Sequence, residues 1–309
     1  MSLAFVFPGQ GSQSVGMLKE LAEVEPVVTE TFKLASAALG YDLWDITQHG
    51  PQEKLNSTDI TQPALLAAGV ACWKVWQDKD ETLPVMLAGH SLGEYTALVC
   101  AGVLDFADAI KLVEVRGQFM QQAVPEGQGG MAAILGLDDS KVVEACQQAA
   151  GSDVLQAVNY NSPGQVVVAG SKAAIDRIVI IAKEMGAKRA LPLPVSVPSH
   201  CDLMKPAAAK LAEKLKSITF NEAIIPVINN VDVLAETDAN KIRDALVRQL
   251  YNPVRWVEII QKMAEEGVDQ LIECGPGRVL VGLNKRIDKS MSAMAVYDPA
   301  SFEKALATQ

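Results

Sequence analysis

A short apolar run from Leu83 to Ala88 leads directly into Gly89-His90-Ser91-Leu92-Gly93, and a helical pattern continues from Leu92 to Cys100. A G-x-S-x-G sequence between a strand and a helix is typical of a nucleophile elbow, where two glycines allow a turn tight enough to expose the serine hydroxyl. A chance match in a Gly-rich turn is the alternative, and the flanking strand and helix disfavour it. The motif therefore predicts Ser91 at the edge of a mainly parallel α/β sheet covered by helices on both faces.

The rest of the chain divides into two parts. Strands are expected at 4–7, 224–229 and 270–274, and helical patterns at 17–39, 61–77, 203–216 and 241–250. Between them, residues 131–191 follow the order β-α-β-β-α-β, which is that of a ferredoxin-like unit. Gly-rich residues precede this unit and prolines follow it, as at the hinges of an inserted domain. We expect a hydrolase-like large α/β domain, residues 1–126 and 195–309, and a ferredoxin-like small subdomain, residues 127–194.

A serine nucleophile needs a base within hydrogen-bond reach, and the chain has only three histidines. His90 adjoins Ser91 in the elbow, where neighbouring side chains diverge, and His49 belongs to a polar, Gly-Pro-containing turn. By elimination His200 is the base, with a structural loop histidine as the alternative. Cys201 beside it invites a Cys/His interpretation, which we disfavour because adjacent side chains point apart. The Leu92 amide, first in the helix, is placed to bind a developing oxyanion.

Arg116 is the most informative charge in the sequence. It shares one face of the expected helix 108–123 with an apolar stripe of Ala109, Leu112, Val113 and Met120. An inward-facing guanidinium must find an anion, because an unpaired buried charge is very costly. A structural ion pair with an internal carboxylate is one possibility. A substrate carboxylate is the other, since this helix directly follows the one that Ser91 begins.

Composition excludes several classes of function. The 309 residues carry 27 Lys and Arg against 37 Asp and Glu, and this net charge of −10 argues against nucleic acid as a partner. No apolar run reaches the roughly 20 residues that cross a bilayer, and no secretory signal is evident, so a cytoplasmic protein without membrane contact is expected. The five cysteines are widely spaced, which indicates reduced thiols rather than disulfides or a metal site.

The N-terminal strand ends at Pro8-Gly9-Gln10-Gly11. Its glycine spacing fits neither a dinucleotide-binding nor a phosphate-binding loop. We instead expect this turn to supply a second hydrogen-bond donor to the oxyanion hole.

Several stretches, in this order, together resemble the bacterial malonyl-CoA:acyl carrier protein transacylases of type II fatty acid synthesis. They are Phe7-Pro8-Gly9-Gln10-Gly11-Ser12-Gln13, Thr61-Gln62-Pro63-Ala64-Leu65, Gly89-His90-Ser91-Leu92-Gly93-Glu94, Arg116-Gly117, Asn161-Ser162-Pro163-Gly164-Gln165, Val197-Pro198-Ser199-His200, Asn229-Asn230-Val231 and Glu273-Cys274-Gly275-Pro276-Gly277. The resemblance extends over the whole chain and implies a hydrolase-like large domain with a ferredoxin-like small one. Val197-Pro198-Ser199-His200 matches neither of the usual forms that sort malonyl from methylmalonyl in polyketide acyltransferases. The free-standing enzymes of fatty acid synthesis commonly have a stretch like this one, which favours malonyl as the acyl group.

The resemblance assigns roles residue by residue. It implies Ser91 as nucleophile, His200 as base, and the main-chain carbonyl of Gln249 as the group that orients His200. It also implies the amides of Gln10 and Leu92 as the oxyanion hole. The expected substrate-binding residues are Arg116, for the malonyl carboxylate, and Gln62.

The implied reaction is ping-pong transfer of malonyl from malonyl-CoA to the phosphopantetheine thiol of holo acyl carrier protein, without metal or other cofactor. An esterase or thioesterase of the α/β-hydrolase type is the alternative, although that fold has its histidine late in the chain and none follows His200 here. A Ser-Asp lipase and a non-catalytic carrier-binding module are weaker alternatives. A monomer is expected.

Carrier protein is itself acidic, so an enzyme of net charge −10 needs a local basic face to bind it. The candidate docking residues are Lys188, Arg189, Arg278, Lys285 and Arg286. A scattered solvated surface is the alternative.

Overall fold

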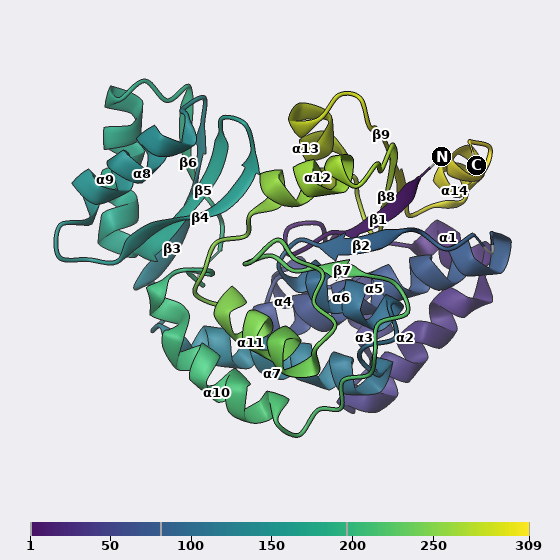
Figure 1. The fold of residues 1–309 in the computed structure, drawn as a ribbon. Helices are drawn as coiled ribbons and strands as arrows, with labels where there is room; N and C mark the ends of the chain where they lie inside the picture. The colour runs from purple at the N-terminus through teal and green to yellow at the C-terminus, as the bar shows by residue number, and fades with distance from the viewer. Residues whose placement is uncertain (1, 81, 196, 309) are drawn as a thin grey trace.

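The computed structural model describes residues 2–80, 82–195 and 197–308, and its strands form two sheets (Figure 1). The larger sheet has five strands in the order β7-β2-β1-β8-β9, and each neighbouring pair is parallel. These strands are β1 (Leu3–Phe7), β2 (Met86–Gly89), β7 (Val227–Ile228), β8 (Gln270–Cys274) and β9 (Ser292–Val296). Every residue of the central β1 is buried, as a strand covered on both faces requires. The predicted parallel α/β sheet is confirmed.

Successive residues of β1 point into two different hydrophobic cores. Phe5 and Phe7 belong to the larger core, where the Phe5 ring packs edge-on against Trp73 with ring centroids 5.1 Å apart. Ala4 and Val6 belong to a second core on the opposite face. This alternation is the period of two that a strand imposes on its side chains.

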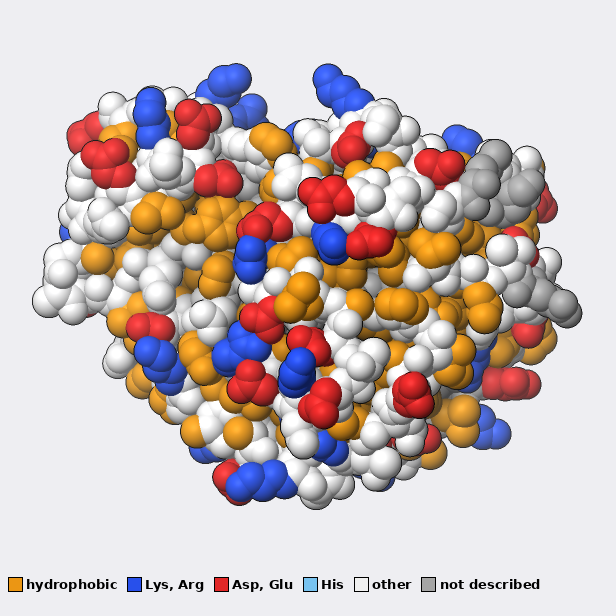
Figure 2. Space-filling view, in the orientation of Figure 1, with side chains coloured by type: hydrophobic (Ala, Val, Ile, Leu, Met, Phe, Trp, Pro, Cys, Tyr) orange, Lys and Arg blue, Asp and Glu red, His pale blue; other side chains and the backbone are white. Residues whose placement is uncertain are grey.

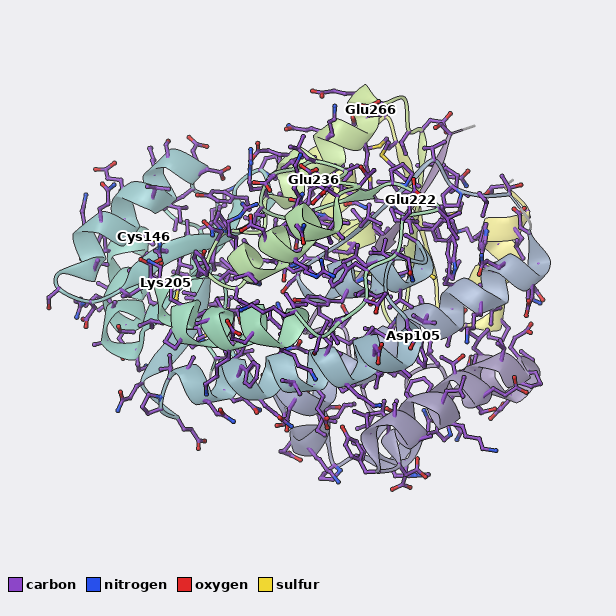
Figure 3. The ribbon with its side chains drawn as sticks, turned by 60° about the horizontal axis from the view of Figure 1, so that its bottom comes forward. Asp105, Cys146, Lys205, Glu222, Glu236 and Glu266 are labelled. Atoms are coloured by element: carbon purple, nitrogen blue, oxygen red, sulfur yellow. The ribbon has the colours of Figure 1, made fainter. Side chains whose placement is uncertain are left out.

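Helices cover both faces of the sheet. Those that pack on the larger core are α1 (Lys19–Val24), α2 (Pro26–Leu39), α3 (Leu43–His49), α4 (Gln52–Leu55), α5 (Thr58–Lys79), α6 (Leu92–Cys100), α7 (Phe106–Ala123), α10 (Lys205–Leu215), α11 (Ala239–Gln249) and α14 (Pro299–Leu306). Those on the second core are α12 (Trp256–Glu265) and α13 (Val279–Ile287). Asp105, labelled in Figure 3, begins α7 by accepting hydrogen bonds from the amides of Ala107 and Asp108.

The second sheet is antiparallel, with its four strands in the order β4-β5-β3-β6. It consists of β3 (Gly129–Leu135), β4 (Leu155–Ser162), β5 (Gln165–Ser171) and β6 (Arg189–Pro192), with α8 (Asp139–Ala150) and α9 (Lys172–Glu184). Each edge strand, β4 and β6, directly follows one of the two helices along the chain. The predicted ferredoxin-like unit is therefore confirmed, and it forms a lobe at the left of Figure 1.

Main-chain hydrogen bonds connect β4 of the small lobe to Val254 of the large domain. The Val254 amide donates to the Val158 carbonyl at 2.8 Å, and the Tyr160 amide donates to the Val254 carbonyl at 3.0 Å. All four strands of the lobe lie within residues 127–194, and we propose this range as the small domain.

Some local predictions needed correction. The helical pattern at 17–39 is divided because Glu25, with φ −123° and ψ 94°, is extended before Pro26. His49 ends α3 rather than lying in a turn. The strand expected at 83–88 begins only at Met86, and that at 224–229 shortens to Val227–Ile228, because Pro84 and Pro226 offer no amide for pairing.

Among the described residues, no helix is both long and apolar enough to cross a membrane.

Candidate active site

The elbow around Ser91 is a strained turn that glycine makes possible. Ser91 has φ 52° and ψ −107°, a conformation that costs a non-glycine residue about 1–3 kcal/mol. A Cβ on Gly89 would lie 1.8 Å from the carbonyl carbon of Gly93, and one on Gly93 would lie 2.1 Å from the Phe7 carbonyl oxygen. The two glycines of the motif thus let β2, α6 and β1 approach closely enough to expose Ser91.

His200 lies within hydrogen-bond reach of Ser91. Its Nε2 is 2.8 Å from Ser91 Oγ, and its Nδ1 is 2.7 Å from the main-chain carbonyl oxygen of Gln249. A carbonyl can only accept, so the proton is on Nδ1, and Nε2 is free to accept the Ser91 hydroxyl proton. Burial, and then the charge of Arg116, lower the pKa of His200 to about 3, which keeps the imidazole neutral at physiological pH. The geometry is that of a nucleophile and its general base.

No recorded hydrogen bond between described residues joins the side chain of either other histidine to Ser91. His49 is exposed at the end of α3 and pairs with Asp45. His90 Nε2 lies 2.8 Å from Oδ1 of Asn161. Cys201 is buried and donates to the Pro198 carbonyl, and burial raises the pKa of its thiol to about 12, so it is not an activated thiolate.

Arg116 is buried beside the nucleophile. Nη1 donates to Gln62 Oε1 at 2.7 Å, Nη2 donates to Gln249 Oε1 at 3.0 Å, and Nη2 is 3.4 Å from Ser91 Oγ. None of the ion pairs between described residues includes Arg116, so the structural ion pair considered from the sequence is absent from this part of the chain. Its Nε has no hydrogen-bond partner. The guanidinium therefore makes no direct ion pair with a described residue and lies next to Ser91, where an anion would be stabilised.

Gln10 and Leu92 line the same small cavity as Ser91 and His200. The cavity measures about 110 Å³ and is lined by Gln10, Gln62, His90, Ser91, Leu92, Arg116, Met120, Met131, Asn159, Leu193, Val195, Val197, Ser199 and His200. Leu92 is the first residue of α6, so its amide has no acceptor within the helix. The structure records no acceptor for the Gln10 amide among the described residues either. Two residues that line this cavity thus have main-chain amides with no recorded acceptor among the described residues.

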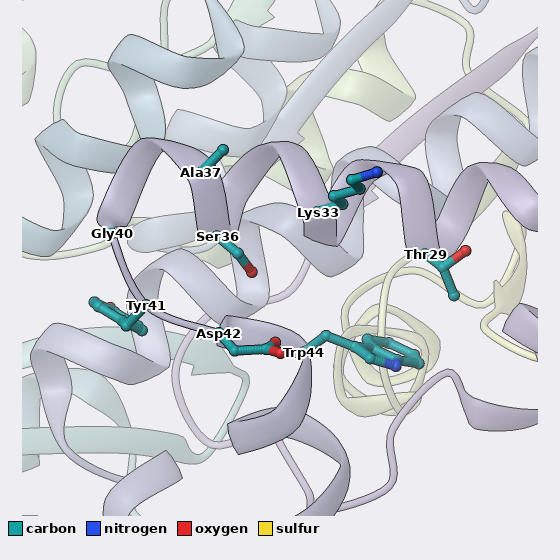
Figure 4. Close-up of a pocket in the computed structure, with 8 residues that line it drawn as sticks. All are labelled: Thr29, Lys33, Ser36, Ala37, Gly40, Tyr41, Asp42 and Trp44. Carbon is teal, nitrogen blue, oxygen red and sulfur yellow. The ribbon is translucent and has the colours of Figure 1, made fainter.

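A larger cavity lies elsewhere. It measures about 450 Å³ and lies between α2 and α3, as Figure 4 shows, lined by Thr29, Lys33, Ser36, Ala37, Gly40, Tyr41, Asp42 and Trp44. None of these eight is a residue that the sequence predicts for the site. Cavity size alone would therefore point away from Ser91.

The candidate docking residues are all exposed and form two groups. Lys188 precedes β6 and Arg189 begins it, Arg278 precedes α13, and Lys285 and Arg286 are in the last turn of α13. Figure 2 shows Lys and Arg side chains projecting from the top of the molecule, over the small lobe and over α13.

The two groups meet at one end of the small sheet. Arg286 Nη1 donates to Gln165 Oε1 at 2.9 Å, and Leu135 lies between Gln165 and Arg189 in the strand register. Arg189 is therefore two strands away from the residue that Arg286 contacts, at the same end of the small sheet.

Sequence reasoning missed three polar residues that contact the elbow. Asn161 Oδ1 lies within hydrogen-bond distance of His90 Nε2. The Asn230 side chain bonds to the main chain of both Ser91 and Gly89. Glu94 is a buried carboxyl group in the first turn of α6. All three lie inside stretches that carry the family resemblance, and a carboxylate on an otherwise apolar helix was the available signal for Glu94.

Comparison with known proteins gives consistent matches. Residues 4–300 match the model of the acyl transferase domain family. The chain is 62% identical over 303 residues to malonyl CoA-acyl carrier protein transacylase of Salmonella typhimurium, covering 98% of both. Its structure is similar to that of an acyl carrier protein S-malonyltransferase from Vibrio cholerae, with a TM-score of 0.96, 62% identity and coverage of 99% of this chain and 100% of the other. It is also similar to a malonyl-transacylase solved in complex with its type II PKS acyl-carrier protein, with a TM-score of 0.99, 59% identity and full coverage of both chains.

Proposed function

The chain belongs to the acyl transferase domain family, and we propose that it is an [acyl-carrier-protein] S-malonyltransferase of fatty acid synthesis. The observation that carries this proposal is the buried guanidinium of Arg116, which makes no direct ion pair with a described residue and lies 3.4 Å from the hydroxyl of Ser91. A thioester that carries a free carboxylate, as malonyl-CoA does, fits a site with a nucleophile and a buried cation side by side.

In the first half-reaction, Ser91 Oγ attacks the thioester carbonyl carbon while His200 Nε2 takes the hydroxyl proton. The oxyanion of the tetrahedral intermediate accepts hydrogen bonds from the amides of Gln10 and Leu92. The intermediate then collapses, the carbon–sulfur bond breaks, and the CoA sulfur leaves with the proton from His200. The products are free CoA and a malonyl ester of Ser91.

In the second half-reaction, the phosphopantetheine thiol of acyl carrier protein enters where CoA left. His200 takes its proton, the sulfur attacks the ester carbonyl, and Ser91 leaves with the proton that His200 returns. No electron is transferred and no proton is lost overall, so the reaction we propose needs no cofactor, and malonyl-CoA is only a substrate.

The malonyl carboxylate binds Arg116 through charge-assisted hydrogen bonds, and Gln62 fixes the guanidinium from its other side. A main-chain carbonyl, that of Gln249, orients His200 in place of the usual carboxylate. A neutral carbonyl stabilises the imidazolium less than a carboxylate would. This is tolerable because a thiolate is a far better leaving group than the amine that proteases expel.

The esterase alternative is less well supported. α/β-Hydrolases orient the histidine with an acidic residue, whereas the group at Nδ1 of His200 is a carbonyl. Hydrolysis also offers no reason to keep a cation beside the nucleophile.

The basic patch of Lys188, Arg189, Arg278, Lys285 and Arg286 is where we propose that the acidic carrier protein docks. The hydrogen bond from Arg286 to Gln165, which joins the two lobes, supports a binding surface that includes both of them. We also propose that the enzyme acts as a monomer in the cytoplasm, where malonyl-CoA and carrier protein occur.

The test is a single-turnover experiment. Wild-type protein mixed with malonyl-CoA should gain the mass of one malonyl group, and added holo acyl carrier protein should remove it as malonyl carrier protein. Ser91→Ala should form no such adduct. An adduct that persists in Ser91→Ala, or a malonyl group released only as free malonate, would contradict the proposal.

A further inference from the structure

Glu94 is a buried carboxylate that the reaction described above does not use. It lies in the first turn of α6, three residues after the nucleophile, and is 2% exposed. One oxygen, Oε2, accepts hydrogen bonds from the main-chain amide of Asn230 at 2.9 Å and from Gln249 Nε2 at 2.8 Å. Both donors come from segments far along the chain, and both also contact Ser91.

Asn230 and Gln249 hold the main chain of Ser91 from its two sides. The Ser91 amide donates to Asn230 Oδ1 at 2.7 Å, and the Ser91 carbonyl accepts from Gln249 Nε2 at 3.1 Å. Asn230 Nδ2 also donates to the carbonyl of Gly89 at 2.7 Å. The strained residue is therefore fixed through its own peptide groups rather than through its side chain.

Glu94 also bonds to a residue whose amide can face only one way. Arg116 Nη2 can only donate and the Ser91 carbonyl can only accept, so the oxygen of the Gln249 amide faces Arg116 and its NH₂ group faces Ser91 and Glu94. The main-chain carbonyl of Gln249 accepts a hydrogen bond from Nδ1 of His200. Glu94 thus holds a residue that contacts the nucleophile, the base and the cation.

We propose that Glu94 is a positioning residue for acyl transfer, whose carboxylate acts through Asn230 and Gln249 to hold Ser91 in the conformation that presents Oγ to His200. The proposal rests on the proposed function only in that Ser91 is the nucleophile. It concerns how reactive Ser91 is, and not which acyl group it accepts.

The experiment measures Ser91 reactivity with an uncharged alkyl fluorophosphonate, a probe that needs neither Arg116 nor carrier protein. Ser91 Oγ attacks phosphorus, fluoride leaves, and His200 takes the hydroxyl proton, so one phosphonyl group is added per active serine. Intact mass against time gives the rate, and circular dichroism with thermal melting gives the folded fraction of each variant.

Glu94→Ala removes both hydrogen bonds, and we expect labelling to slow by at least 30-fold in folded protein. Glu94→Gln should rescue the rate to within about threefold of wild type, because its amide oxygen can still accept from both donors. Its NH₂ would face a cavity of about 10 Å³ lined partly by Asn229 and by Glu236, which Figure 3 labels, and both side chains offer an acceptor oxygen.

Glu273 supplies a matched control. It is also fully buried, and its Oε2 accepts from the amide of Val281 at 2.8 Å in the first turn of α13, away from the elbow. Glu273→Ala should lower the melting temperature yet leave the labelling rate of folded protein unchanged. A purely structural role for Glu94 would make the two alanine variants behave alike.

Folded Glu94→Ala that labels at the wild-type rate would overturn the proposal. If that variant does not fold, Glu94→Asp is measured instead. Its shorter carboxylate cannot reach both donors, so slower labelling supports the proposal and full-rate labelling overturns it. Wild-type protein that labels in this Glu94-dependent way but transfers no malonyl would refute the proposed function and leave the positioning role standing.

Discussion

His200 Nε2 lies 2.8 Å from Ser91 Oγ, although 109 residues separate the two in the chain. Both residues also have positive φ, 52° for Ser91 and 68° for His200, and they are two of only four described non-glycine residues that do. Such conformations persist where the surrounding structure over-determines them. Here the Ser91 main chain is held by Asn230 and Gln249, and the His200 amide donates to the Leu250 carbonyl at 2.9 Å.

The first prediction concerns the pH dependence of the base. Burial and the charge of Arg116 lower the pKa of His200 to about 3, so the neutral imidazole should remain available well below pH 6.5. The fluorophosphonate labelling rate of Ser91 should therefore stay level from pH 8 to about pH 5. A rate that halves near pH 6.5 in folded protein would contradict this. His200→Ala should label about 10²–10⁴ times more slowly at every pH in that range.

The same lowered pKa has a consequence for stability. Between the folded value near 3 and the unfolded value near 6.5, the unfolded chain binds the proton and the folded protein does not, so His200 lowers stability as the pH falls. His200→Gln should remove this contribution and flatten the fall in melting temperature between pH 7 and pH 5. Wild-type and variant curves that run parallel over this range would contradict it.

The third prediction tests Arg116 as the group that selects the acyl chain. A hydrogen bond to a charged group is worth about 1.5–3 kcal/mol, so loss of two should lower kcat/KM for malonyl-CoA by about 10²–10⁴-fold in Arg116→Ala. Activity with uncharged acetyl-CoA should be retained or should rise. The measurement is transfer to carrier protein from each thioester. Equal losses on both substrates would show that Arg116 does not bind the carboxylate.

Ser91 could be predicted from the sequence because it lies in a local motif with its own strand and helix. His200 could be predicted by elimination because the chain has only three histidines. Arg116 could be predicted to face inward because a charge on an apolar helical stripe is itself informative. The antiparallel order of the small sheet follows from the sequence of its elements.

The polar residues around the elbow could not be predicted in the same way. Asn230 and Gln249 bond to Ser91 across separations of 139 and 158 residues, and no periodicity records such contacts. The Gln249 amide bonds to Ser91, Glu94 and Arg116, which the fold alone brings together, so its role could not be inferred from any local pattern. The strand expected at 224–229 is too long because its apolar pattern includes Pro226, which has no amide to donate, and the amide of Ile224 donates to Ala101 outside the sheet.

The fourth prediction concerns the basic patch. Charge reversal in Lys285→Glu/Arg286→Glu should raise the apparent KM for acyl carrier protein about tenfold at low salt, and added salt should reduce the difference. Fluorophosphonate labelling of Ser91 should not change, because that probe carries no charge. The matched control is Lys33→Glu/Lys304→Glu, which makes the same change in net charge on α2 and α14. Equal effects from both pairs would mean that only the net charge matters and that the docking surface is elsewhere.

The last prediction tests how tightly the elbow is packed by comparing two glycines, Gly89, which has no room for a side chain, and Gly282, which has open space around it. A Cβ at position 89 would lie 1.8 to 2.2 Å from main-chain atoms of Gly93 and Glu94, which cannot move without breaking the turn. Gly89→Ala should therefore lose on the order of 3 kcal/mol or more of stability. Gly282, inside α13, has open space around its Cβ position and no positive φ, so Gly282→Ala should raise stability by about 0.5–1 kcal/mol. Urea denaturation measures both variants, and a Gly89→Ala protein as stable as wild type would mean that the elbow is not this tightly packed.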